Sequence, residues 1–409
     1  MVRKSEPLID NFTLFLKKIL LLIDNYVMIR YIVSQIFQKE KNMKISKETL
    51  EEFEIKYDIS RLAPIDELIF LDIETTGFTA RSSYLYLIGC AYNEGGKWCT
   101  VQYLSESYEQ EVDILKAFYD FAKDYKYLVH FNGNQFDMPY LVQKCKQHEL
   151  DINFDSFSGI DLYKRISPCK VFLGLQNCKQ KTMEKYLGID REDAFSGGEL
   201  IGVYHDYVKD PSEFARNTLL LHNEDDLKGM LSILPMLAYF DLFNNSLHVK
   251  KASAGSTKDY SGALRQELIL TAQLPVTLPK SVSASAYGCY FHGEGDEGSF
   301  RIPIYNEEMK YFYANYKDYY YLPEEDVALH KSVSSFVEKE HRTQATAATC
   351  YTRKQSRYLP QFDTLFEPVF RREYRSKECF FELTDELKRD RAAFTEYANH
   401  ILQTIGTTY

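Results

Sequence analysis

Short apolar runs bounded by turn residues mark the first strands of the chain. The run Leu68–Ile73 precedes the turn signal Thr75-Thr76-Gly77, which is typical of a buried strand. Two further runs, Tyr84–Tyr92 and Trp98–Leu104, flank the sequence Asn-Glu-Gly-Gly at 93–96, which favours a hairpin turn. The three segments therefore predict an antiparallel meander.

Helical spacing then alternates with strand signals. Apolar residues recur at intervals of three and four within Glu109–Tyr125, and Tyr127–Phe131 has the pattern of the next strand. Shorter helices are predicted at Leu162–Ile166 and Thr182–Leu187, and one long helix at Ala215–Tyr239. Strands that alternate with helices predict an α/β fold with a mixed sheet flanked by helices.

The remaining part of the chain has a different pattern. Small and polar residues in Asn244–Lys258 are typical of a linker. Glu267–Leu278 and Phe300–Ile304 have the pattern of strands, whereas Pro323–Glu340 and Thr384–Ile401 have that of capped amphipathic helices. A smaller α+β domain is therefore expected to follow the first.

Composition and length place the chain among globular proteins. It has 409 residues, of which 45% are hydrophobic and 26% charged, enough for two or three domains. The predicted parts are an N-terminal extension at 1–59, the α/β domain at 60–245 and the α+β domain at 246–409. The net charge of −10 argues against nucleic acid coating the whole surface, but it permits a local basic groove.

The N-terminal extension and the cysteines indicate where in the cell the protein is expected. Residues 1–42 differ in composition from the rest of the chain, so they are either dispensable or an amphipathic helix. Their apolar run Phe12–Ile23 contains Lys17 and Lys18 and is shorter than a membrane span, so no membrane contact is predicted. The 8 cysteines lack the spacing of a zinc site, which favours a reducing cytoplasm.

Four carboxylates and one histidine carry the candidate chemistry. Asp72 and Glu74 are two residues apart on a predicted strand and so share a face. Asp137 lies in a turn that leads into a helix, and His222 precedes Asp226 by one helical turn. Taken singly, these groups fit a strand edge, a helix N-cap and a surface pair. Together they would repel one another unless divalent cations neutralised them.

Three segments resemble the exonuclease motifs of the DEDD superfamily of 3′–5′ exonucleases. They are Asp72-Ile-Glu-Thr-Thr-Gly77, Asn132-x-x-x-Phe-Asp-x-Pro-Tyr-Leu141 and His222-x-x-x-Asp226. The resemblance covers about residues 60 to 245 and extends to a bacterial group of predicted exonucleases typified by YprB. It implies a ribonuclease H-like fold. In one departure, His222 has the spacing that the family's tyrosine subgroup gives to a tyrosine.

The resemblance also implies an activity and the residues that carry it. A 3′–5′ exonuclease of this type hydrolyses single-stranded nucleic acid with two Mg²⁺ or Mn²⁺ ions, about 3.5 to 4 Å apart, that bracket the phosphate. His222 would orient or deprotonate the attacking water. The implied metal ligands are Asp72, Glu74, Asp137 and Asp226. The candidate substrate contacts are Asn132, Phe136 and Thr75.

Two other functions fit the same pattern. One is an inactive or weakly active ribonuclease H-like adaptor that binds nucleic acid, and the other is a structure-specific endonuclease. No motif chooses between RNA and DNA. The aromatic run Tyr311–Tyr321 and the basic clusters at 353–357 and 371–375 would suit stacked bases and phosphates, or else core packing and a solvated face.

Overall fold

The computed structural model describes residues 43–51, 53–189, 195, 197–258 and 262–408. The leader at 1–42, including its predicted amphipathic helix, lies outside these residues. The remaining part of the predicted extension contains a strand, β1 (Lys44–Leu50), which pairs antiparallel with β4 (Lys97–Leu104). Most of its side chains are exposed and several are charged, which suits an edge strand. These residues therefore belong to the main sheet.

Six strands form the main sheet in the order β1-β4-β3-β2-β5-β6. The predicted meander is confirmed, because β2 (Leu68–Thr75) pairs antiparallel with β3 (Leu85–Glu94), which in turn pairs with β4. Strands β5 (Tyr127–His130) and β6 (Ser158–Asp161) extend the sheet in parallel on the other side of β2. The sheet is therefore mixed, as predicted, and β2 lies inside it.

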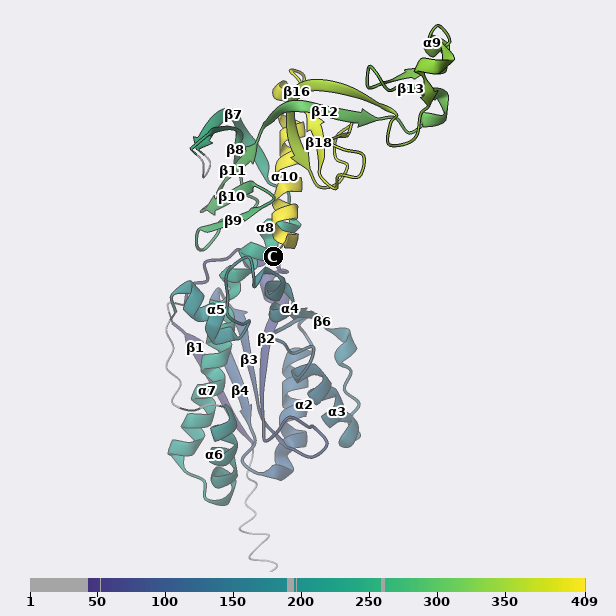
Figure 1. Ribbon diagram of the computed structural model, residues 1–409. Coiled ribbons are helices and arrows are strands. Elements are labelled where there is room, and N and C mark those ends of the chain that lie inside the picture. The colour runs from purple at the N-terminus through teal and green to yellow at the C-terminus, as the bar shows by residue number, and fades with distance from the viewer. Residues whose placement is uncertain (1–42, 52, 190–194, 196, 259–261, 409) are drawn as a thin grey trace, which may run out of the picture.

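Helices cover both faces of this sheet (Figure 1). One face carries α2 (Glu111–Ala122) and α3 (Asp137–Gln147), and the opposite face carries α7 (Glu213–Ser232), which contacts β2, β3 and β4. The other helices of this unit are α4 (Leu162–Ile166), α5 (Gln180–Leu187) and α6 (Gly197–Lys209). The predicted α/β architecture is confirmed.

The side chains of β2 alternate between two cores, because successive residues of a strand point to opposite faces. Residues 69, 71 and 73 pack in the core that contains the buried side chains of α2. Residues 68 and 70 pack in the core that contains the buried side chains of α7. Asp72 and Glu74 continue the second set, so the alternation directs both carboxylates toward α7.

The single helix predicted at Ala215–Tyr239 is wrong, because the segment is interrupted. Helix α7 ends at Ser232, a 3₁₀ turn follows at Leu234–Met236, and α8 (Leu237–Asn244) begins after it. Pro235 explains the interruption, since proline has no N–H to donate and its ring clashes with the preceding helical turn.

The linker predicted at Asn244–Lys258 is also wrong. Strand β7 (His248–Lys258) occupies most of it and pairs antiparallel with β8 (Leu264–Gln273). Small and polar residues suit β7 because it is an edge strand with mostly exposed side chains. Gly255 lets the Ile269 side chain of β8 pack closely, since a Cβ atom there would lie 2.5 Å from its terminal methyl group.

A five-stranded antiparallel sheet begins with β7 and has the order β7-β8-β11-β10-β9. Its remaining strands are β9 (Val282–Ala286), β10 (Cys289–Glu294) and β11 (Glu297–Pro303). The expected strands at 267–278 and 300–304 are confirmed in place, with shifted ends. The β10–β11 hairpin turns at residues 295 and 296.

Helix α10 (Arg391–Thr408) packs on this sheet and also contacts α8, the last helix of the main unit. The helix predicted at Thr384–Ile401 begins later than expected, after Asp390, whose Oδ1 accepts a hydrogen bond from a backbone N–H of the first turn. Asn399 accepts a hydrogen bond from the backbone N–H of Leu247 (3.1 Å) and donates one to its carbonyl (3.3 Å). Leu247 lies in the connection between α8 and β7, so α10 holds this connection.

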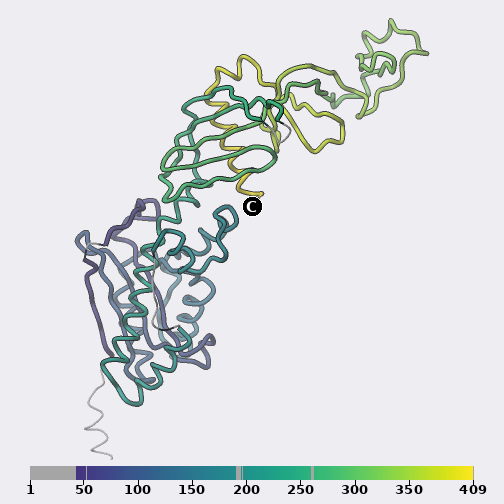
Figure 2. Tube along the Cα trace, turned by 60° about the vertical axis from the view of Figure 1, so that its left-hand side comes forward, coloured from purple at the N-terminus to yellow at the C-terminus, as the bar shows by residue number. Residues whose placement is uncertain are grey.

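A barrel and a small sheet extend beyond the second sheet (Figure 2). The closed barrel consists of β12 (Tyr305–Phe312), β16 (Tyr351–Gln361), β17 (Phe370–Arg371) and β18 (Cys379–Glu382). The three-stranded sheet consists of β13 (Tyr319–Leu322), β14 (Val327–His330) and β15 (Thr343–Gln344). The second part of the chain is thus mainly antiparallel sheet with one long helix.

The helix predicted at Pro323–Glu340 is wrong. Only the short α9 (Lys331–Ser334) and a 3₁₀ turn are helical there, because the segment first returns antiparallel to β13 as strand β14. The aromatic β-formers of β13 favour this pairing over a helix.

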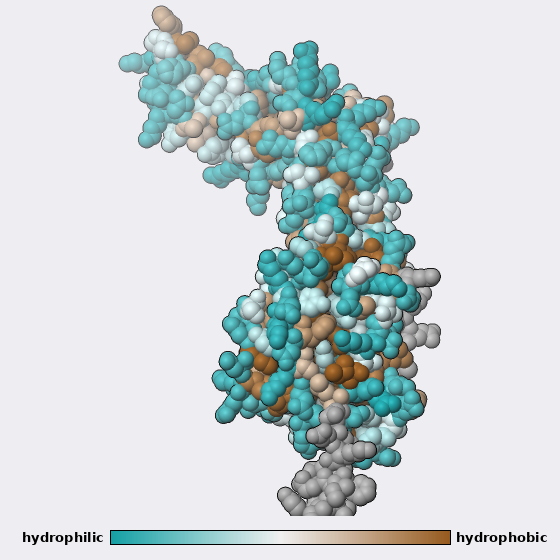
Figure 3. All heavy atoms as spheres, turned by 180° about the vertical axis from the view of Figure 1, so that it is seen from behind, coloured by the Kyte–Doolittle hydropathy of each residue, from teal (hydrophilic) through white to brown (hydrophobic). Residues whose placement is uncertain are grey.

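Hydrophilic residues predominate on the face seen in Figure 3, with smaller hydrophobic areas on the main unit and at the far tip. At the tip, Val333 and Phe336 are 54% and 90% exposed. Within the described ranges, no helix has the length and apolar character needed to cross a membrane.

Candidate active site

Side chains of β2 and α7 converge on one point. Glu74 comes from the end of β2, and His222 and Asp226 lie one turn apart on α7. The Nε2 atom of His222 is 3.7 Å from Glu74 Oε1 and 3.5 Å from Asp226 Oδ2. One potential ligand atom from each of these residues lies within 4.8 Å of the other two. Asp72 adjoins the group, since the charges of Glu74 and Asp226 raise its pKa.

Asp137 reaches the same region from the start of α3. Although an N-cap was a simple interpretation of this residue, the structure makes it the first residue of the helix, after Phe136. Its side chain is buried, and the backbone N–H groups of Asp137 and Ile73 hydrogen-bond its carboxylate. Its charge raises the pKa values of Asp72 and Glu74. All four predicted carboxylates therefore lie close enough to interact.

Burial and mutual repulsion raise the pKa values of three of these carboxyls. Burial, followed by the charges of Asp226, Glu74 and Asp137, places the pKa of Asp72 well above its usual range. Burial, followed by the charges of Asp226 and Asp137, raises the pKa of Glu74 to about 8. Burial raises that of Asp137 to about 7. Without a cation, burial and repulsion therefore favour the protonated form of these carboxyls.

The donor set fits a hard divalent cation. Carboxylate oxygens are the ligands that Mg²⁺ and Mn²⁺ prefer, and four carboxylates converge here. A bound cation would restore the ionised form of these groups, because its charge offsets both burial and repulsion. His222 lies between two of the carboxylates and so can contact either a cation or a water at the same place.

The three predicted substrate contacts lie on the segments that carry the cluster: Thr75 follows Glu74 on β2, and Asn132 and Phe136 precede Asp137. The hydroxyl of Thr75 donates a hydrogen bond to the carbonyl of Gly77 (3.0 Å), so it supports the turn after β2. Asn132 has a φ of +61°, which asparagine tolerates better than most residues, and its backbone N–H donates to Asp161 Oδ1 (3.0 Å). Phe136 is partly buried, just before Asp137.

Sequence reasoning did not identify Phe78, in the turn after β2, as a candidate substrate contact. Its side chain is 92% exposed, and its ring contacts that of Phe136 edge to face, with the centroids 6.2 Å apart. Together with Pro139 and Tyr140, these rings line a shallow pocket of about 300 Å³. The signal in the sequence is a lone aromatic residue in an otherwise polar turn after Gly77.

Two buried polar residues next to the cluster were also missed. Asn223 of α7 donates a hydrogen bond through Nδ2 to Asp72 Oδ2 (2.8 Å). It occupies the stripe that also contains the buried residues 219, 227 and 230, so a polar residue within an apolar stripe is its signal. Asp161 ends β6, accepts hydrogen bonds from the backbone N–H groups of Asn132 and Asn134, and raises the pKa of Asp137.

The aromatic and basic segments of the second part are engaged with their own neighbours. Tyr313 and Tyr319 stack with their ring centroids 4.8 Å apart. Lys310, Arg353 and Arg372 each pair with a glutamate, at 3.0, 3.5 and 2.7 Å. These contacts favour the interpretation of this region as packing and a solvated face.

Comparison with known proteins identifies the fold of the first unit. Residues 69–238 match the family model of the RNase H superfamily. This range contains β2 to β6 and the helices on both faces of the sheet, so the expectation of a ribonuclease H-like fold is confirmed. No curated protein has a significant sequence match to the chain.

Solved structures with partial similarity include two DNA-processing enzymes. The family B DNA polymerase of the archaeon Pyrobaculum calidifontis has 13% identity and a TM-score of 0.33, covering 61% of this chain and 35% of the polymerase. The zinc-bound ExoI–ssDNA complex of E. coli has 13% identity and a TM-score of 0.25, covering 51% of this chain and 55% of that one. The chain thus spans between a third and just over half of these proteins, and similarity this weak identifies no activity.

Proposed function

We propose that the protein is a metal-dependent nuclease that removes nucleotides from the 3′ end of single-stranded nucleic acid. The observation that carries the proposal is the convergence of Asp72, Glu74, Asp137 and Asp226, from three separate segments, within an RNase H-like domain. The raised pKa values of three of these carboxyls support the proposal, because a bound cation would offset the burial and repulsion that raise them. The sequence departs from the exonuclease motifs that it resembles only at His222, which has the spacing of a tyrosine.

The chain's own residues divide the task. The four carboxylates would hold Mg²⁺ or Mn²⁺, and the bound ions supply positive charge where negative charge develops on the phosphate. His222, between Glu74 and Asp226, would accept a proton from the attacking water through Nε2. Two ions are the arrangement that the resemblance implies, and the four carboxylates suffice for it.

Two aromatic residues favour an unpaired strand as substrate. Phe136 directly precedes Asp137, and its ring contacts that of Phe78, which is exposed; exposed rings of this kind stack on unpaired bases. A paired base would not offer its face to them. The strand end would therefore lie over the shallow pocket, with its last phosphate toward Asp72.

Phe78→Ala is expected to weaken binding of a single-stranded oligonucleotide about tenfold, because stacking on one base is worth about 1 to 3 kcal/mol. Fluorescence anisotropy with a labelled oligonucleotide and Ca²⁺ in place of Mg²⁺ measures the dissociation constant. Phe336→Ala is the matched control, since Phe336 is equally exposed but lies at the far tip, on the turn after α9. Equal affinities for the two variants would contradict the role of Phe78.

The decisive experiment follows one labelled strand end at a time. Purified protein with Mg²⁺ or Mn²⁺ is incubated with single-stranded DNA and RNA labelled at the 5′ end, with and without a blocked 3′ end. Progressive shortening that a 3′ block prevents supports the proposal. Internal cuts that ignore the block would replace it with an endonuclease, and binding without hydrolysis under every metal would leave only an adaptor.

A further inference from the structure

The buried amide of Asn223 contacts the Asp72 carboxylate directly. Asn223 is fully buried, and its Nδ2 donates to Asp72 Oδ2 (2.8 Å) and, at longer range, to the Asp72 carbonyl (3.4 Å). Its Oδ1 accepts a hydrogen bond from Gln102 Nε2 (2.9 Å). Gln102 is on β4 and is 1% exposed. The side-chain amides of Gln102 and Asn223 thus form a hydrogen-bonded chain that runs from β4, through α7, to Asp72 on β2.

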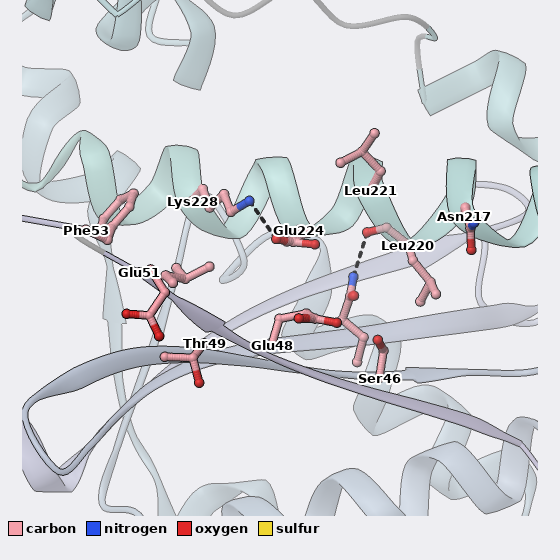
Figure 4. A pocket seen from close by; sticks show the side chains of 12 residues that line it. Ser46, Glu48, Thr49, Glu51, Phe53, Asn217, Leu220, Leu221, Glu224 and Lys228 are labelled. Carbon is pink, nitrogen blue, oxygen red and sulfur yellow. Dashed lines mark hydrogen bonds and ion pairs between the residues drawn. The ribbon is translucent and has the colours of Figure 1, made fainter.

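The direction of this hydrogen-bonded chain is fixed at its outer end. An amide has nearly the same shape when its oxygen and nitrogen are exchanged, so shape alone cannot orient Asn223. Gln102 Nε2 also donates to the backbone carbonyl of Leu220 (2.7 Å), the contact drawn as a dashed line at Leu220 in Figure 4. A carbonyl can only accept, so the NH₂ group of Gln102 must face α7. Asn223 must then turn its oxygen to Gln102 and its NH₂ group to Asp72.

The absence of a side chain at Gly89 makes room in the main sheet for the Asn223 amide. Gly89 of β3 pairs with Asp72 of β2, and a Cβ atom there would lie 1.9 Å from Asn223 Oδ1. Asn223 is fully buried, so its side chain would have to shift from its present position to relieve such a contact. Glycine normally weakens a strand. At position 89 its lack of a side chain is useful, because it makes space for the Asn223 amide.

We propose that Gln102 and Asn223 are positioning residues that fix the orientation of the Asp72 carboxylate. The Asn223 amide holds Oδ2 of Asp72, which leaves Oδ1 for the cation. Gln102 does not contact Asp72 itself. It acts through Asn223, because its NH₂ group prevents the Asn223 amide from adopting the reversed orientation. The inference rests on the proposed function, in which Asp72 holds the cation.

Two substitutions that preserve shape test the direction of the hydrogen bonds. Asn223→Asp replaces the donor toward Asp72 with an acceptor. Gln102→Glu removes the donor toward Leu220 and Asn223, so the Asn223 amide reverses and presents its oxygen to Asp72. For each variant we expect kcat to fall about 10- to 100-fold, as is typical when a partner of a metal ligand is lost, with KM changed less than about threefold. Mn²⁺ affinity, measured by calorimetry without substrate, should fall in parallel.

Gly89→Ala provides a test that leaves both amides in the chain. We expect the added methyl group to displace Asn223 and reproduce the loss in kcat and in Mn²⁺ affinity. Gly159→Ala is the control, because Gly159 is a strand residue of the same sheet whose added Cβ would have no neighbour closer than 3.6 Å. Its kcat and Mn²⁺ affinity should equal those of the unmodified protein. Each variant is first checked for cooperative thermal melting, and those that melt cooperatively decide the outcome.

Unchanged kcat and Mn²⁺ affinity in folded Gln102→Glu or Gly89→Ala protein would overturn the positioning role while leaving the nuclease proposal intact. A fall in kcat with unchanged Mn²⁺ affinity would also overturn it, because Asp72 would then hold the cation without help. If the unmodified protein hydrolyses no substrate, the proposed function fails instead. Calorimetry alone then decides the inference: weaker Mn²⁺ binding in these variants supports it, and equal or absent binding overturns it.

Discussion

Asp72→Asn is expected to lower the rate of 3′-end hydrolysis about 10³-fold, since a bound cation contributes several kcal/mol to the transition state. The same change should stabilise the metal-free protein at pH 8, because it removes a buried carboxyl whose pKa is raised well above its usual range. A gain of about 1 kcal/mol would raise the melting temperature by about 2 to 4 °C. Activity and stability thus move in opposite directions.

Asp113→Asn is the matched control, because Asp113 is exposed on α2. We expect it to change neither the rate nor the melting temperature measurably. A contaminating nuclease is recognised when the residual activity does not co-elute with the Asp72→Asn protein on gel filtration. Full activity in a clean Asp72→Asn preparation would refute the assignment of the site.

Stability of the metal-free protein is expected to fall as the pH rises from about 5 to 8. The pKa of Glu74 increases from 4.5 to about 8 on folding, so in this range the folded state binds more protons than the unfolded state. The contribution of Glu74 to the free energy of unfolding is therefore fully present below pH 4.5 and is lost as the pH rises toward 8. For Glu74 alone the loss by pH 7 is on the order of 3 kcal/mol. Urea denaturation at a series of pH values in EDTA measures it.

Mn²⁺ should reverse this dependence. Binding requires ionised carboxylates, so the ion should stabilise the protein more at pH 8 than at pH 6 and release protons on binding at pH 7. Glu74→Gln removes the carboxyl whose pKa burial and repulsion raise to about 8, and it should flatten the curve obtained in EDTA. A curve for the unmodified protein that is already flat between pH 5 and 8 would show that Glu74 is not held in a repulsive cluster.

The sequence predicted the first unit well because local and global signals agree there. In β2 the apolar run, the period of two and the following turn all indicate one strand, and the same period places Asp72 and Glu74 on one face. The four carboxylates could be found because each stands at the end of an element or on the border of an apolar stripe.

Long-range contacts explain what the sequence did not predict. Asn223 and Gln102 are ordinary polar residues until two strands and a helix bring them together, and Gly89 acquires its role only from that contact. In the second part, β7 has the small polar residues of a linker, and its pairing with β8 outweighs that local preference. The residues at 323–340 likewise follow the hairpin with β13.

The contact between Asn399 and Leu247 has a consequence for biosynthesis. The two residues are 152 positions apart, and their hydrogen bonds hold the connection between the main unit and the second sheet. On the ribosome, the whole RNase H-like unit and every strand from β7 to β18 emerge before Asn399 does. A nascent chain interrupted before α10 would therefore carry the complete carboxylate cluster but would lack the hydrogen bonds that Asn399 makes to this connection.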